Sequence, residues 1–188
     1  EYPPYIEGGL GRHVAELVPS LAQQGVTIHL VTPVPEPIPS QLFDEVALST
    51  SEDGEGEARA TVEDGVIVHR VFTTPSPPGS DIYVRVTEAN TILQTYTQGL
   101  QEKYGEFNVI HTHDWLTAFT SMALKQTWNV PLVTTIHATE RGRGRGHLSG
   151  PLQRSIDKTA RDLINEATRV IVCSQYMSPE LQSFFDLP

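Results

Sequence analysis

Three short segments of the sequence join glycines or ionisable side chains in patterns that suit substrate binding. The first, Glu7-Gly8-Gly9-Leu10-Gly11, stands directly before an apolar pattern with helical spacing. Free backbone N–H groups at the start of a helix, together with the positive end of its dipole, suit a phosphate group. Glycines in this place are equally typical of a plain tight turn, so this pattern alone leaves both interpretations open.

The second segment, His111-Thr112-His113-Asp114-Trp115, closes an expected apolar strand. His111 and His113 fall on one side of that strand if it continues through them. Asp114 opens the helix that follows, where a carboxylate can cap the helix. One interpretation makes Asp114 a cap and His111 a hydrogen-bonded core residue, and the other places these side chains in an active site.

The third segment begins at the end of another apolar strand and contains His137, Glu140, Arg141 and the glycine–arginine stretch 142–146. His137 is an isolated ionisable group where the chain leaves the sheet, which is where α/β proteins bind their ligands. The glycine–arginine stretch either folds over an anionic ligand or is an ordinary loop. An RNA-binding role is the weaker interpretation because the chain carries a net charge of −10.

Hydrophobic periodicity predicts the strands and helices that position these segments. Strands are expected at residues 26–32, 66–72, 107–111, 132–136 and 170–173, and helices at 10–24, 84–104, 116–127 and 152–167. Pro19 is expected to kink the first helix, and the acidic residues 49–57 to form an exposed loop. This alternation predicts an α/β fold, a doubly wound and mainly parallel sheet with helices on both faces and with sites at the carboxyl ends of its strands.

Length, charge and cysteine content predict one cytoplasmic domain. The 188 residues suffice for one well-packed domain. The net charge of −10 opposes binding to nucleic acid or to an anionic membrane surface. The one cysteine, Cys173, has apolar neighbours and is expected to be buried in a reducing compartment. No apolar run reaches the roughly 20 residues that span a bilayer.

Taken together, the three segments resemble those of a known enzyme family. Residues 1–4 with the double glycine, residues 111–115 and residues 135–137 are similar to the N-terminal domain of glycogen and starch synthases and of the related family 4 retaining glycosyltransferases. Residues 170–177 resemble the last strand of that domain, and residues 185–188 resemble the segment before its linker. The likeness runs over almost the whole chain and implies the Rossmann-like half of a GT-B fold.

The resemblance implies that residues 1–188 form a single N-terminal, acceptor-side domain. In the family a C-terminal domain supplies most contacts to the nucleotide sugar, so we expect this chain alone to be inactive. We also expect a first strand before Glu1, outside the sequence. The implied substrates are a nucleotide sugar such as ADP-glucose or UDP-glucose and a glucan or other carbohydrate acceptor. Neither a metal nor another cofactor is expected.

The resemblance also implies roles for particular residues. Gly8 and Gly9 would contact the diphosphate of the donor through their backbone N–H groups. His137 would lie beside the reacting sugar, where it positions and polarises rather than acting as a strong base. Asp114 would lie near the acceptor.

The remaining substrate-binding positions and the identity of the donor follow from the same resemblance. His113, Glu140 and Arg141 are expected to contact substrate. Bacterial glycogen synthases often carry a lysine shortly before the double glycine, whereas this chain has Ile6 and Glu7 there. A carboxylate beside a diphosphate is unfavourable unless it points away, so the donor nucleotide stays open.

Two other functions remain compatible with the same residues. His111, His113, Asp114 and His137 offer imidazole and carboxylate ligands that suit zinc or manganese, as in a metal-dependent hydrolase. The sequence lacks a helical His-x-x-x-His pair and a second carboxylate cluster, which weakens that interpretation. A non-catalytic module that binds carbohydrate or nucleotide is the other alternative.

Overall fold

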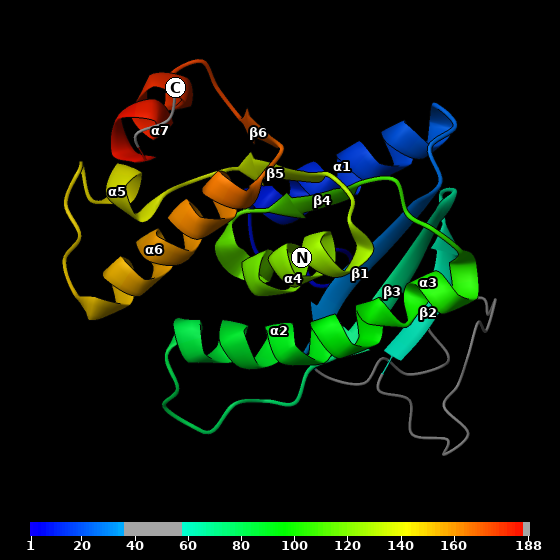
Figure 1. The fold of residues 1–188 in the computed structure, drawn as a ribbon. Helices are drawn as coiled ribbons and strands as arrows, with labels where there is room; N and C mark the ends of the chain where they lie inside the picture. The colour runs from blue at the N-terminus through cyan, green and yellow to red at the C-terminus, as the bar shows by residue number, and fades with distance from the viewer. Residues whose placement is uncertain (36–57, 186–188) are drawn as a thin grey trace. The chain divides into compact units, whose positions relative to one another are not determined.

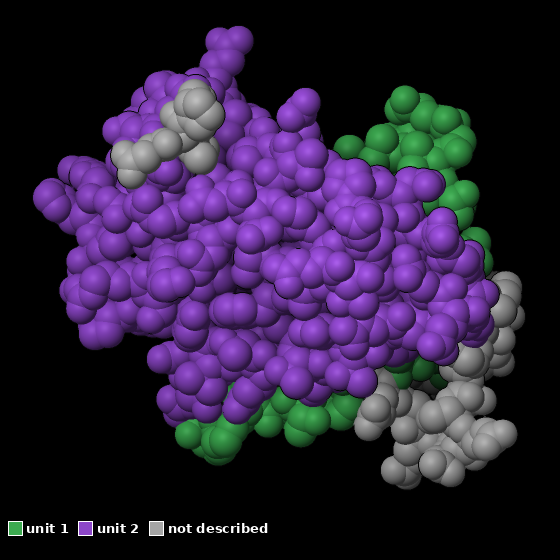
Figure 2. Space-filling view, viewed as in Figure 1, with its two compact units in different colours: residues 1–78 green, residues 79–188 purple. Residues whose placement is uncertain are grey.

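The computed structural model describes residues 1–35 and 58–185, and the chain divides into two compact units, 1–78 and 79–188 (Figures 1 and 2). The acidic loop expected at 49–57 and the last three residues of the chain lie outside the described residues. Within residues 1–35 and 58–185, no helix is long and apolar enough to cross a membrane.

The first unit packs one helix on a three-stranded sheet. Its elements are α1 (Gly9–Gln23), β1 (Ile28–Val34), β2 (Ala58–Glu63) and β3 (Val66–Phe72). The strand order is β1-β3-β2, with β1 parallel and β2 antiparallel to β3. Asp64 and Gly65, both with positive φ, connect β2 to β3 in the Asp-Gly turn that favours a hairpin.

Helix α1 buries one face against this sheet. Val14 and Val18 point into a core that contains Val66 and Val68 of β3. Their spacing of four residues is the periodicity that predicted the helix. The helix continues through Pro19 and ends at Gln23, so this proline does not end it.

The second unit is a parallel sheet with helical connections. Its elements are α2 (Ile82–Gln98), α3 (Leu100–Tyr104), β4 (Ile110–His113), the 3₁₀ turn η2 (Trp115–Thr117), α4 (Ala118–Trp128), β5 (Leu132–Ile136), α5 (Glu140–Arg143), α6 (Pro151–Glu166), β6 (Arg169–Val172) and α7 (Met177–Phe185). The strand order is β4-β5-β6 and all pairs are parallel. Figure 1 shows α4 and α6 alongside this sheet.

Two β-α-β crossovers build this unit, β4-α4-β5 and β5-α6-β6. Leu132 of β5 packs with Ala118 of α4 and Leu163 of α6 in one buried cluster. Ile136, at the end of β5, packs with Ile164 and with apolar residues of α7. The predicted α/β fold with mainly parallel strands is therefore confirmed.

Several element boundaries differ from those predicted. Strand β2 was not expected, and β4 begins at Ile110 rather than at residue 107. The long helix expected at 84–104 is divided into α2 and α3 at Gly99. Part of the glycine–arginine stretch is helical, because α5 covers Glu140–Arg143.

Candidate functional site

The register of the second sheet brings the carboxyl ends of its three strands together. His113, the last residue of β4, pairs with Thr135 of β5, and Ile136 of β5 pairs with Val172 of β6. His137 and Cys173 are therefore the first residues to leave two neighbouring strands at the same level. This edge is where open parallel sheets bind their ligands.

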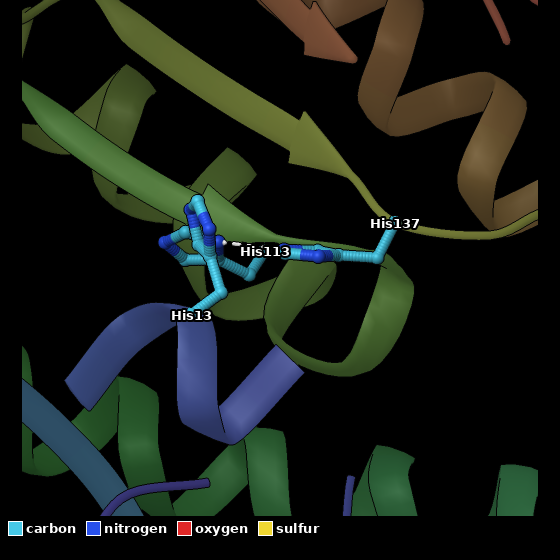
Figure 3. Close-up of side chains that lie close together, drawn as sticks. All are labelled: His13, His113 and His137. Carbon is cyan, nitrogen blue, oxygen red and sulfur yellow. Dashed lines mark hydrogen bonds between the residues drawn. The ribbon is translucent and has the colours of Figure 1, made fainter. Parts of the chain in front are cut away.

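Two imidazoles meet at this edge. Nδ1 of His113 lies 3.1 Å from Nε2 of His137, within hydrogen-bond distance, and the close-up view shows the two rings pointing toward one another (Figure 3). His13, also drawn there, belongs to α1 of the first unit. The sequence placed His113 and His137 at successive strand ends, and the structure brings their rings together.

His111 lies on the same side of β4 as His113, as strand geometry predicts. The two rings stack with centroids 4.5 Å apart. Nε2 of His111 lies 2.8 Å from Oγ1 of Thr135 on β5. His111 is exposed, so the interpretation of it as a core residue is wrong.

Asp114 reaches across to β5 instead of capping its own helix. Its Oδ1 accepts hydrogen bonds from the backbone N–H groups of His137, at 2.6 Å, and of Ala138, at 3.5 Å. It makes no side-chain cap to the 3₁₀ turn that follows, so the interpretation as an N-cap is wrong. The carboxylate therefore fixes the backbone that carries His137.

The carboxyl pKa and the backbone dihedral angles of Asp114 are both unusual. Burial raises the pKa of its carboxyl group, against the lowering effect of the hydrogen bond from the His137 backbone. Its backbone has φ 52° and ψ −165°, a region that is strained for any residue except glycine. Strain of this kind occurs most often at functional sites, which agrees with the position of Asp114 at the sheet edge.

Cys173 joins the same cluster from β6. Its Sγ lies 3.3 Å from Nδ1 of His137, the ring nitrogen that faces away from His113. Partial burial, and then the nearby charge of Asp114, raise the pKa of the thiol above its usual range. The thiol is exposed, so the expectation that it is buried is wrong, because it follows the last residue of an edge strand.

Glu140 and Arg141, the other predicted substrate contacts of this unit, lie on α5. Thr139 caps this helix by accepting from the N–H of Gly142 at 2.9 Å. Glu140 lies 3.4 Å from the guanidinium of Arg143. Arg141 donates two hydrogen bonds to the carboxylate of Asp157 on α6, at 2.9 and 3.1 Å.

Neither Thr139 nor Asp157 was singled out from the sequence. Asp157 lies in the middle of an amphipathic helix, where an acidic residue usually faces solvent. Its buried position beside the Arg141 guanidinium depends on the tertiary packing of α5 against α6. Thr139 does carry a local signal, because threonine directly before a short helix is a typical cap.

The glycine turn belongs to the first unit and holds a carboxylate. The backbone N–H groups of Glu7 and Gly8 both donate to Oε2 of Glu1, each at 3.2 Å. A Cβ atom at Gly11 would lie 2.9 Å from the Cβ atom of Glu1, so this close packing favours a glycine there. The side chain of Glu7 is exposed. The turn therefore presents its N–H groups to an anionic oxygen, as a phosphate-binding turn does.

The cluster of the second unit suits hydrogen bonding to hydroxyl groups. Linked imidazoles can donate and accept protons, and their position at the sheet edge gives access to a ligand. For the alternative of a metal-dependent hydrolase, His113 and His137 offer two nitrogens close together. Oδ1 of Asp114 accepts from the backbone N–H group of His137.

Comparisons with known proteins assign the chain to a class of enzymes. The model of Glycosyltransferase Family 4 matches residues 7–188. The chain therefore belongs to this family of glycosyltransferases.

Individual relatives agree with this assignment. The chain is 32% identical over 194 residues to a glycogen synthase of Mycobacterium tuberculosis, a match that covers 98% of this chain and 43% of that protein. It is 28% identical to an uncharacterized glycosyltransferase of Methanocaldococcus jannaschii, covering 100% of this chain and 42% of the relative. It is 24% identical to a D-inositol 3-phosphate glycosyltransferase of Pseudarthrobacter chlorophenolicus, covering 95% and 39%. The chain thus spans about two fifths of the length of these relatives.

The fold is also found in a solved structure. Sucrose-phosphate synthase from Thermosynechococcus elongatus matches with a TM-score of 0.64 and 19% sequence identity, covering 94% of this chain and 39% of that one. This likeness supports the GT-B type of fold that the sequence predicted.

Proposed function

We propose that this chain is the acceptor-side half of a retaining glycosyltransferase that moves glucose from a nucleotide sugar to a glucan. The observation that carries the proposal is the cluster at the carboxyl edge of β4 and β5. There Asp114 fixes the backbone of His137, and His113 contacts its ring. The family assignment supports the transfer of a sugar, and the similarity to a glycogen synthase supports a glucose donor and a glucan acceptor.

In this proposal His137 acts as a hydrogen-bond donor beside the reacting sugar. Asp114 positions His137, because its Oδ1 accepts from the backbone N–H groups of His137 and Ala138. The leaving phosphate of the donor helps to remove the proton of the acceptor hydroxyl on the same face of the sugar. Neither a metal nor another cofactor is then needed, and the role of the protein is positioning and polarisation.

The glycine turn of the first unit would take the diphosphate. Gly8 and Gly9 would donate from their backbone N–H groups, and Glu1 now accepts from the N–H of Gly8. Because Glu1 supplies an anionic oxygen at this turn, the donor phosphate would have to displace it. The side chain of Glu7 is exposed, and the proposal keeps both ADP-glucose and UDP-glucose as donors.

Arg141 and Glu140 would contribute to the substrate site mainly through the position of α5. The bidentate pair between Arg141 and Asp157 leaves one terminal nitrogen of the guanidinium outside the pair. That nitrogen would donate to an anionic or hydroxyl group of the substrate.

Sugar transfer from radiolabelled ADP-glucose or UDP-glucose to glycogen tests the proposal. The intact protein that contains this chain should transfer glucose, and the 188-residue chain alone should not. His137→Ala should lower turnover by about 10²- to 10⁴-fold in the intact protein with an unchanged melting temperature. His147→Ala, an exposed histidine in the loop after α5, is the matched control and should keep full activity.

Three results would contradict the proposal. Normal turnover of His137→Ala would remove His137 from the site. Transfer by the chain alone would show that no further domain is needed. Tightly bound zinc at one ion per chain would favour the metal-dependent hydrolase instead.

A further inference from the structure

Residues His113, Asp114, His137 and Cys173 form a cluster at the strand ends, called here the strand-end cluster. Neither the family assignment nor the proposed mechanism gives Cys173 a role. Because Ile136 pairs with Val172, the residues that follow them, His137 and Cys173, leave the sheet side by side. Sγ of Cys173 lies 3.3 Å from Nδ1 of His137, a normal distance for a hydrogen bond to sulfur. The contact is direct and lies on the opposite side of the ring from His113.

The direction of this hydrogen bond follows from the chemistry of the two groups. A neutral imidazole nitrogen is a good acceptor, whereas sulfur is a weak one, so S–H to Nδ1 is favoured over N–H to sulfur. The raised pKa of Cys173 keeps the thiol protonated near neutral pH, which supplies the proton that this bond requires.

This direction bears on the tautomers of His137 and His113. If Nδ1 of His137 accepts, its proton is on Nε2, and Nε2–H then donates to Nδ1 of His113 at 3.1 Å. His113 in turn carries its proton on its own Nε2. Each contact then joins one donor to one acceptor.

We propose that Cys173 is a positioning residue, whose S–H donates to Nδ1 of His137 and so keeps the proton of that ring on Nε2. His137 is thereby held as an N–H donor rather than as a base. The tautomer is a property of this chain alone. Its use rests on the proposed function: a sugar oxygen would replace Nδ1 of His113 as the acceptor of the Nε2–H.

Nitrogen NMR of the chain with ¹⁵N-labelled histidine tests the tautomer directly. His137 should show a protonated Nε2 and a bare Nδ1, its resonances identified by their loss in His137→Ala. Cys173→Ala should give a mixture of both tautomers for His137. Cys173→Ser keeps an O–H donor, although the Cβ–O bond of serine is shorter than the Cβ–S bond of cysteine. Compared with Cys173→Ala, it should restore most of the Nε2–H form of His137. Gln175→Ala, an exposed residue of the same segment, is the control and should change nothing.

Two outcomes would overturn the proposal. One is a wild-type His137 that carries its proton on Nδ1, and the other is an unchanged tautomer in Cys173→Ala. Because Cys173 is exposed, Cys173→Ala should keep the fold and a melting temperature within about 2 °C of the wild type.

Kinetics of the intact protein test the use of the tautomer. Cys173→Ala should lower kcat about fivefold with little change in KM, and Cys173→Ser should recover part of the loss. An unchanged kcat in Cys173→Ala would contradict the proposal that the His137 Nε2–H donates to the sugar. Absence of transfer by the wild type would contradict the proposed function and would leave the NMR result to decide the tautomer separately.

Discussion

Each of the two units contains a pair of histidines that lie on, or directly after, neighbouring parallel strands, with nearly equal distances between their ring nitrogens. In the first unit, Nδ1 of His29 on β1 lies 3.0 Å from Nε2 of His69 on β3. In the second, the corresponding distance between His113 and His137 is 3.1 Å. The contact itself therefore does not distinguish the two pairs.

The position of each pair in its sheet does distinguish them. His29 and His69 lie within β1 and β3, and His69 is fully buried. His113 is the last residue of β4, and His137 follows β5, so this pair lies where the chain leaves the sheet. We infer that the first pair stabilises the fold and that the second serves the site.

The largest effect on stability is expected for His69→Ala. Loss of a fully buried ring leaves a cavity and removes the partner of His29, which should cost about 3 kcal/mol of unfolding free energy. Urea denaturation measures this cost. His113→Ala and His137→Ala should each cost clearly less, and equal costs at the two pairs would break the distinction between them.

A smaller effect is expected at Asp114, which connects the site to its scaffold. Asp114→Ala leaves the backbone N–H of His137 without its acceptor and should cost about 1–3 kcal/mol of unfolding free energy. Asp114→Asn keeps an oxygen that accepts this hydrogen bond.

The raised pKa of Asp114 determines whether Asp114→Asn stabilises or destabilises the folded chain. Because burial raises this pKa in the folded chain, ionisation of Asp114 costs folding free energy as the pH rises from the ordinary value through the raised one. Asp114→Asn has no such cost and should be at least as stable as the wild type at neutral pH. Thermal melts measure both variants, and a strongly destabilised Asp114→Asn would show that the negative charge itself is required.

The smallest effect is a pH dependence that belongs to the first pair. Burial lowers the pKa of His29 in the folded chain, so the unfolded chain takes up a proton first as the pH falls through the ordinary histidine range. Stability from this group is therefore present at neutral pH and is lost under mild acid. His29→Gln should reduce the acid-induced fall in melting temperature by about 2 °C. An identical fall in both proteins would assign this pH dependence to other groups.

Much of the fold was predictable because its strands carry strong local signals. The apolar, β-branched runs at 66–72 and 132–136 predicted β3 and β5 with their observed bounds. The start of β4 was misplaced because Phe107 is apolar for another reason, since its ring stacks on Trp128 at 5.0 Å. Packing between distant residues of this kind leaves no trace in local periodicity.

Only those parts of the candidate site that follow from the positions of the strand ends could be predicted from the sequence. The sequence placed His113 and His137 at one edge because parallel strands share their carboxyl ends. Asp114 contacts the backbone of His137, directly after β5, from a residue with positive φ, and no local pattern indicated this conformation. The approach of Cys173 to His137 depends on the register between β5 and β6, which the sequence alone does not fix.

The distinction between the two histidine pairs is tested most directly by titrating the ¹⁵N-labelled chain with a malto-oligosaccharide and following the histidine resonances. If the strand-end cluster binds the acceptor, the resonances of His113 and His137 should shift in a saturable way, and those of His29 and His69 should not. Shifts confined to His29 and His69, or no shift of His113 and His137 at saturating sugar, would contradict the account.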